Sequence, residues 1–162
     1  MERAIEVVEA FLKENDWTYS TQSLKEGIFR FELPFTVRNV RLRLRIMLEA
    51  EAKVCQIDAV LPITPDPQYV YPLCSLLAKE NYNKRYGSFK FDERDGELTY
   101  EYSFSIARGL ETEDLDKFFH AVVGSALAGY DEIRRYCVGR FKGDEAKVIV
   151  EKANLLINDL CE

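Results

Sequence analysis

Histidine is almost absent from this chain of 162 residues, and negative charge exceeds positive charge. His120 is the single histidine, so acid–base catalysis or metal binding by imidazole groups has one residue to draw on. We expect His120 to be an ordinary surface residue of a helix. The chain has 28 acidic and 22 basic residues and a net charge of −6. We therefore predict no nucleic-acid and no membrane partner, because both require a basic surface.

Closely spaced cysteines and long apolar runs are also missing. The four cysteines, Cys55, Cys74, Cys137 and Cys161, include no C-x-x-C pair, so neither a zinc site nor a disulfide framework is indicated. We expect Cys55 and Cys74 to be small buried side chains. We predict no metal, no cofactor and no catalytic residue. The chain has neither a membrane-length apolar run nor a signal peptide, so a cytoplasmic location is expected.

Alternating apolar and polar residues predict several β-strands. The clearest alternation is at 40–48, where Leu42 and Leu44 are separated by arginines. The predicted strands are 28–33, 40–48, 54–61, 88–92 and 97–106. We expect Pro34 to end the first of them, because proline cannot donate a hydrogen bond to a neighbouring strand. The segment 17–22 fits either a short strand or a return loop.

Helical spacing of apolar residues is typical of four other segments. The predicted helices are 2–14, 67 to about 82, 112 to about 137, and 144–160. Asp66 and Pro67 suit the cap and the first position of the second helix. Gly139 to Gly143 interrupt the chain before the last helix.

These elements predict an α+β fold of the order α-β-β-β-α-β-β-α plus a C-terminal helix. A five-stranded antiparallel sheet with helices packed on one face would bury every apolar stripe. Residues 1–138 form the predicted domain, and residues 139–162 form a turn and an amphipathic helical appendage. The apolar stripe of the appendage either completes the core of its own chain or pairs with another molecule.

A series of short motifs lies between residues 76 and 133. They are Leu76-Leu77-x-x-x-Asn81, Gly87-x-Phe89-x-x-Asp92, Asp95-Gly96-Glu97-Leu98-x-Tyr100 and Leu110-Glu111-Thr112-Glu113-Asp114-Leu115. This pattern resembles the YbjN family of bacterial sensory transduction regulators, and it also resembles the class I type III secretion chaperones. The resemblance covers residues 2–137 in element order. It implies a non-enzymatic, protein-binding role, and neither family has catalytic residues to transfer to this chain.

Arg41, Arg43 and Arg45 share one face of the predicted strand 40–48 and form the first candidate site. A row of three arginines is suited to an anion or an acidic peptide. The alternative is a solvated sheet face on which the arginines pair with neighbouring strands. The expected partners in that case are Glu32, Gln56 and Asp58.

Small residues form the second candidate site, opposite the apolar stripe of the helix beginning at 112. They are Ala121, Gly124, Ser125 and Ala128. Small side chains let another helix approach closely. The helix 144–160 of the same chain, or a second copy in a homodimer, could dock on this face. The third interpretation is a small, solvated helix face.

Three functions are compatible with the sequence. The first is a cytoplasmic protein-binding module of the YbjN or chaperone-like class, forming a homodimer. The second is a secretion chaperone proper, whose client is an effector protein. The third is a small enzyme with carboxylate chemistry, which no motif supports.

Overall fold

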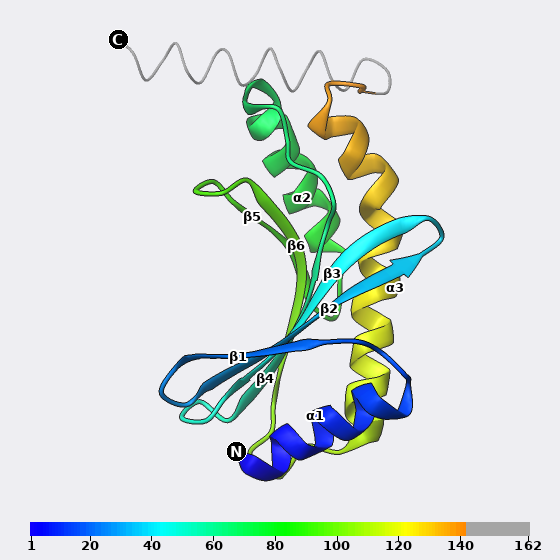
Figure 1. Cartoon of the computed structure of the whole chain (residues 1–162). Coiled ribbons are helices and arrows are strands. Elements are labelled where there is room, and N and C mark those ends of the chain that lie inside the picture. Colours follow the sequence, from blue (N-terminus) through cyan, green and yellow to red (C-terminus); the bar gives the residue numbers. More distant parts are fainter. Residues whose placement is uncertain (142–162) are drawn as a thin grey trace.

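The computed structural model describes residues 1–141 (Figure 1). The described elements are α1 (Glu2–Glu14), β1 (Ser20–Lys25), β2 (Ile28–Val37), β3 (Val40–Glu49), β4 (Val54–Val60), the 3-10 turn η1 (Pro67–Tyr69), α2 (Val70–Tyr82), β5 (Ser88–Asp92), β6 (Glu97–Ser105) and α3 (Thr112–Cys137). The predicted helix 144–160, and with it most of the predicted appendage, lies outside the described residues.

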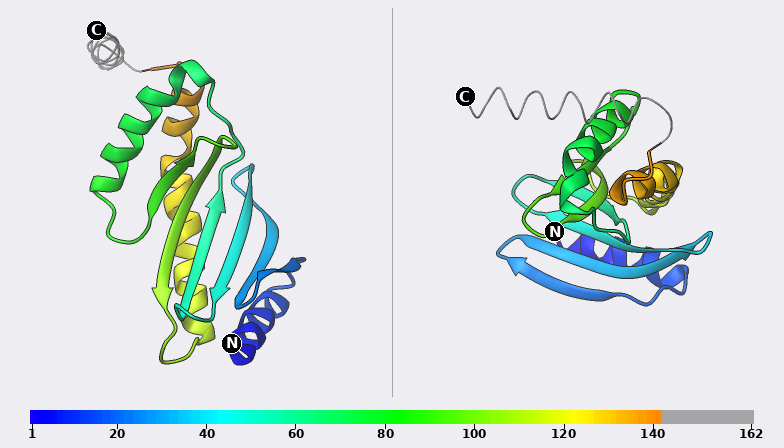
Figure 2. Two further views of the ribbon diagram at one scale, coloured as in Figure 1. Left: turned by 90° about the vertical axis from the view of Figure 1, so that its left-hand side faces the viewer. Right: turned by 90° about the horizontal axis from the view of Figure 1, so that it is seen from above.

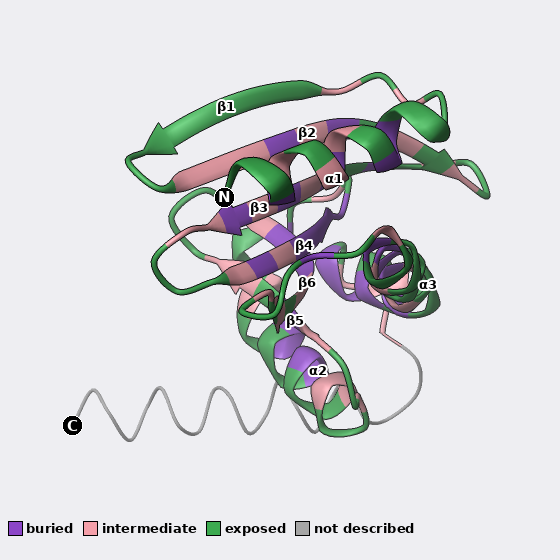
Figure 3. Cartoon of the chain, turned by 90° about the horizontal axis from the view of Figure 1, so that it is seen from below, coloured by how far each residue is buried: buried purple, intermediate pink, exposed green. Residues whose placement is uncertain are grey.

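All strands join one antiparallel sheet in the order β1-β2-β3-β4-β6-β5. The predicted α+β fold with an antiparallel sheet is confirmed, but the predicted number of five strands is wrong, because the sheet has six. The additional strand is β1, which begins within the segment 17–22. Every residue of β1 is exposed (Figure 3), so no covered face imposes an alternating pattern on its sequence.

The prediction that Pro34 ends a strand is also wrong. Strand β2 continues to Val37 and pairs Pro34 with Arg43 of β3. On its other side, β2 pairs with β1 only as far as Glu32. Pro34 therefore lies where β2 is an edge strand, and an edge tolerates a residue without an N–H donor.

One face of the sheet is covered by the helices and the other is polar. The inward residues Leu42, Leu44, Ile46 and Leu48 of β3 are almost completely buried. Figure 2 shows α3 running behind the sheet, and the buried residues of α1, α2 and α3 belong to the same core as these strand residues. The described helices thus pack on one face, as the apolar stripes require.

Trp17 closes the core between α1 and β1. Its ring stacks on Phe119 of α3 with centroids 4.8 Å apart. It also meets the edge of Phe35 at 5.2 Å. This contact fixes the path of the chain from α1 to the otherwise exposed β1.

Candidate interaction surface

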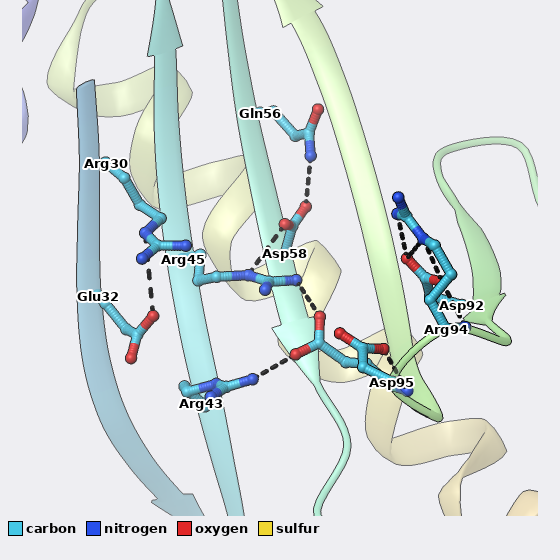
Figure 4. Close-up of polar contacts among 10 residues, drawn as sticks. Arg30, Glu32, Arg43, Arg45, Gln56, Asp58, Asp92, Arg94 and Asp95 are labelled. Carbon is cyan, nitrogen blue, oxygen red and sulfur yellow. Dashed lines mark hydrogen bonds and ion pairs between the residues drawn. The ribbon is translucent and has the colours of Figure 1, made fainter. Parts of the chain in front are cut away.

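Arg45 is the centre of a network of charges on the polar face of the sheet (Figure 4). Its Nη2 lies 2.7 Å from Oε1 of Glu97. Its Nε lies 3.2 Å from Oδ2 of Asp58, without the geometry of a hydrogen bond. Arg43 pairs with the second oxygen of Glu97, and Gln56 donates to Asp58 at 2.9 Å. Arg43 and Arg45 are therefore held by groups of their own chain.

Asp58 is the buried member of this network. The strand register places it directly opposite Arg45, and its side chain is 4% exposed. Burial raises the pKa of Asp58 above its ordinary value, whereas Arg45 and the hydrogen bond from Gln56 lower it. The ionised carboxylate thus depends on Arg45 to offset the loss of water around it.

The structure separates the three arginines of the predicted site. The expected partner Asp58 pairs with Arg45. Glu32 lies opposite Arg45 in the strand register, but its ion pair is with Arg30, at 4.0 Å. Glu97 was not among the expected partners. Arg41 is exposed and forms no ion pair within residues 1–141. Of the predicted row, Arg41 alone has no ion pair in the described part of the chain.

A hollow of about 700 Å³ lies beside Arg45 on the polar face. Its charged lining consists of the acids Asp58, Asp92, Glu93, Asp95, Glu97 and Glu101 and the bases Arg45, Lys90 and Arg94. Acids predominate, and most of them pair with neighbouring bases. This lining does not favour an acidic ligand.

The described cysteines are thiols of raised pKa, and the histidine lies on the surface. Burial raises the pKa of Cys55 to about 12 and that of Cys137 to about 11, so both are protonated thiols at neutral pH. The prediction that Cys74 is buried is wrong, because its side chain faces outward from α2. His120 is exposed, as expected. Residues 1–141 contain no group of three or more metal-ligating side chains.

The predicted small-residue face of α3 is open to solvent in the described structure. Ala121, Gly124 and Ala128 are exposed and Ser125 is half-buried. A Cβ atom added at Gly124 would meet no described atom within 4 Å. Nothing in residues 1–141 covers this face, and the helix expected to dock on it lies outside the described part.

Two glycines of α3 provide a prediction with an internal control. Gly124→Ala is expected to raise the free energy of unfolding by about 0.5–1 kcal/mol, because alanine favours the helix and has free space. Gly129→Ala is expected to lower it by about 1–2 kcal/mol, since the new Cβ would lie 2.6 Å from Cζ of Phe89. Urea denaturation of both variants measures the difference. Equal effects of the same sign would contradict this account of α3.

Asn81 covers the free edge of β5 at Phe89. Its side-chain amide donates to the carbonyl of Phe89 at 2.9 Å and accepts from the N–H of Phe89 at 2.7 Å. The side chain thereby takes the place of a neighbouring strand. The motif residue Asn81, singled out in the sequence at a helix end, thus ties α2 to β5.

Four aromatic side chains meet on the surface where β6 extends beyond β5. This aromatic cluster consists of Tyr86, Tyr102, Phe104 and Phe118. The ring of Phe118 on α3 lies 4.8 Å from that of Tyr102 and 4.6 Å from that of Phe104. Tyr86 packs edge-on against Tyr102 at 5.8 Å and is itself 59% exposed. The other three rings are half-buried, so the cluster presents apolar area to solvent.

The aromatic cluster was not predicted as a site. The sequence contains part of the information that predicts this site, because the expected strand 88–92 is shorter than its expected partner 97–106. Tyr102 and Phe104 therefore lie in the part of the longer strand that the shorter strand does not reach. The arrival of Phe118 from α3 depends on helix packing, which the sequence pattern does not specify.

The fold defines the class of the protein: an α+β domain with an antiparallel sheet covered on one face by helices. A sequence model described as "YbjN: Putative bacterial sensory transduction regulator" matches residues 4–135. The chain belongs to the YbjN family. This confirms the family resemblance noted in the sequence. A comparison with curated proteins finds no match.

Two solved structures show the same fold at low sequence identity. The crystal structure of YbjN from E. coli is 14% identical, with a TM-score of 0.62, and the match covers 82% of this chain and 92% of that one. A chain of the HopA1–SchA chaperone–effector complex is also 14% identical, with a TM-score of 0.51, covering 79% of this chain and 92% of that one. No helix in residues 1–141 is long and apolar enough to cross a membrane.

Proposed function

We propose that this protein is a non-enzymatic adaptor or regulator that binds another polypeptide through the aromatic cluster. The observation that carries the proposal is the convergence of Tyr102, Phe104 and Phe118 at a solvent-exposed end of the sheet. Aromatic side chains of this kind dominate the binding energy of protein interfaces. A cytoplasmic location is part of the proposal.

The competing surface is the exposed Arg41 at the end of the predicted arginine row. Binding there would be electrostatic and therefore sensitive to salt. Binding to the aromatic cluster depends mainly on apolar burial and would persist at high salt. The salt dependence of partner binding thus distinguishes the two surfaces.

The test is a tagged pull-down from the source lysate at low and high salt, followed by mass spectrometry. We expect one stoichiometric partner that the wild type retains at high salt. Phe118→Ala is expected to weaken its capture about tenfold or more, the usual loss at a central aromatic contact.

Tyr82→Ala is the matched control, because Tyr82 is 90% exposed and has no ring contact in the described structure. Circular dichroism of both variants checks that they fold. Equal capture by Phe118→Ala and the wild type would contradict the proposal. Loss of the partner at high salt together with loss in Arg41→Ala would place binding on the arginine row.

A dedicated secretion chaperone is a second candidate function. The support is the fold shared with a chain of a chaperone–effector complex. The identity of the captured partner separates the two candidates, since a secretion chaperone would retain an effector.

Self-association through Ala121, Gly124, Ser125 and Ala128 belongs to the same proposal. The support is the exposure of small residues on α3. Light scattering of the full chain at several concentrations measures it directly.

A further inference from the structure

The outer edge of β6 is open beyond the end of β5. Pairing of β5 with β6 ends at Ser88 opposite Glu101, whereas β6 pairs with β4 as far as Ser105. Residues 102–105 of β6 therefore have a neighbouring strand on one side alone within the described part of the chain. Figure 2 shows β6 continuing past the short β5.

The backbone groups of Ser103 and Ser105 point to this open edge. The carbonyl of Leu98 accepts from the N–H of Leu61 at 2.8 Å, and the N–H of Ile106 also donates toward the β4 side. Successive residues of a strand direct their backbone groups to opposite edges, so those of Ser103 and Ser105 face away from β4. No described residue forms a hydrogen bond with these groups.

The other edges of the described sheet each carry a feature that opposes strand pairing. Asn81 occupies both outward backbone groups of Phe89 on β5. The edge of β1 is polar, and a register shift between Ser23 and Lys25 interrupts it. Beyond β1, strand β2 carries Pro34. Bulges, proline and charge are the devices that prevent pairing at exposed edges.

We propose that residues 102–105 of β6 accept an extended segment of a partner protein as an additional strand. Alternate apolar side chains of that segment rest on Tyr102, Phe104 and Phe118, while the side chains between them face the small Ser103 and Ser105. This inference rests on the proposed function and adds the mode of binding to it. Backbone hydrogen bonds supply affinity in such a complex, and the aromatic cluster supplies specificity.

The charged groups near the cluster include two exposed acids of α3 and one base, Lys117, whose Nζ lies 5.1 Å from the centroid of the Phe118 ring. Asp114 lies one helical turn before Phe118 on α3 and is exposed, as is Glu113. The chain as a whole carries a net charge of −6. The segment that fits this surface has lysine or arginine beside its alternating apolar residues.

The test uses the full chain and a synthetic fluorescent peptide of about nine residues, long enough to span this edge. The peptide has valine at alternate positions, threonine between the valines and lysine at both ends. A peptide of the same composition with consecutive valines is the control. Fluorescence anisotropy measures binding to the wild type, Ser103→Pro, Ser103→Ala and Phe118→Ala.

We expect the wild type and Ser103→Ala to bind the alternating peptide equally, and both to bind the control peptide more weakly. Ser103→Pro removes the outward N–H and is expected to weaken binding about tenfold. The pairing with β4 does not use this N–H, so the sheet tolerates the proline, which circular dichroism checks.

Equal binding by Ser103→Pro and Ser103→Ala would overturn strand addition. If Phe118→Ala alone then lost the peptide or the captured partner, the proposed function would stand without this binding mode. If neither the wild type nor any variant bound the alternating peptide, binding by strand addition would also be overturned. The lysate experiment with Phe118→Ala decides the proposed function independently.

Discussion

Replacing Arg45 with alanine is expected to lower the free energy of unfolding by about 3–5 kcal/mol at neutral pH. The change leaves the carboxylate of Asp58, which is 4% exposed, without its nearest positive charge. The hydrogen bond from Gln56 and the positive charge of Lys90 would then be left to compensate for the lost water around Asp58. Chemical denaturation at neutral pH measures the loss.

The cost of this substitution depends on pH. Because the pKa of Asp58 is raised in the folded protein, its contribution to stability is present at low pH and is lost as pH rises through the folded pKa. Removing Arg45 raises this pKa further. The destabilisation in Arg45→Ala is therefore expected to be largest at neutral pH and to decrease as Asp58 becomes protonated on acidification.

Arg41→Ala is the matched control on the same strand. Arg41 is exposed and has no ion pair within the described residues, so its removal is expected to change stability by less than about 0.5 kcal/mol. Equal losses in Arg41→Ala and Arg45→Ala would show that the network around Glu97 does not stabilise the sheet. In that case all three arginines would again be candidates for binding an external anion.

Asn81→Ala is expected to lower the free energy of unfolding by about 2–3 kcal/mol. The substitution removes two hydrogen bonds and leaves both outward backbone groups of Phe89 without partners. It also exposes an edge strand, so we expect increased aggregation on heating. Urea denaturation and light scattering measure the two effects.

Asn83→Ala is the control for this prediction, because Asn83 is exposed two residues later and its side chain forms no hydrogen bond in the described structure. Its expected effect is below about 0.5 kcal/mol. Asn81→Asp retains the acceptor for the Phe89 N–H and loses the donor. Its stability is therefore expected to lie between those of Asn81→Ala and Asn83→Ala. An Asn81→Ala variant as stable as Asn83→Ala would show that β5 needs no protection.

The strands with one covered face could be predicted from the sequence, and β1 could not. The alternation at 40–48 reflects the burial of Leu42 and Leu44 beside outward arginines. Strand β1 buries neither face, so hydrogen bonding to β2 defines it without an apolar pattern.

The candidate surfaces could likewise be predicted from the sequence only in part. Arg43 and Arg45 were correctly placed on one strand face, but their shared partner Glu97 lies 54 residues from Arg43 in sequence. That contact depends on β4 pairing with β6 rather than with β5, which residue patterns do not reveal. The convergence of Phe118 with Tyr102 likewise depends on how α3 packs.

Amide hydrogen exchange along β6, with and without the alternating peptide, tests the binding of an extended segment most directly. We predict that the peptide slows exchange at the Ser103 and Ser105 amides, which are free at the open edge, and leaves exchange beside Arg41 unchanged. Protection beside Arg41 with no change at Ser103 and Ser105 would contradict the account and place the interaction on the polar face of the sheet.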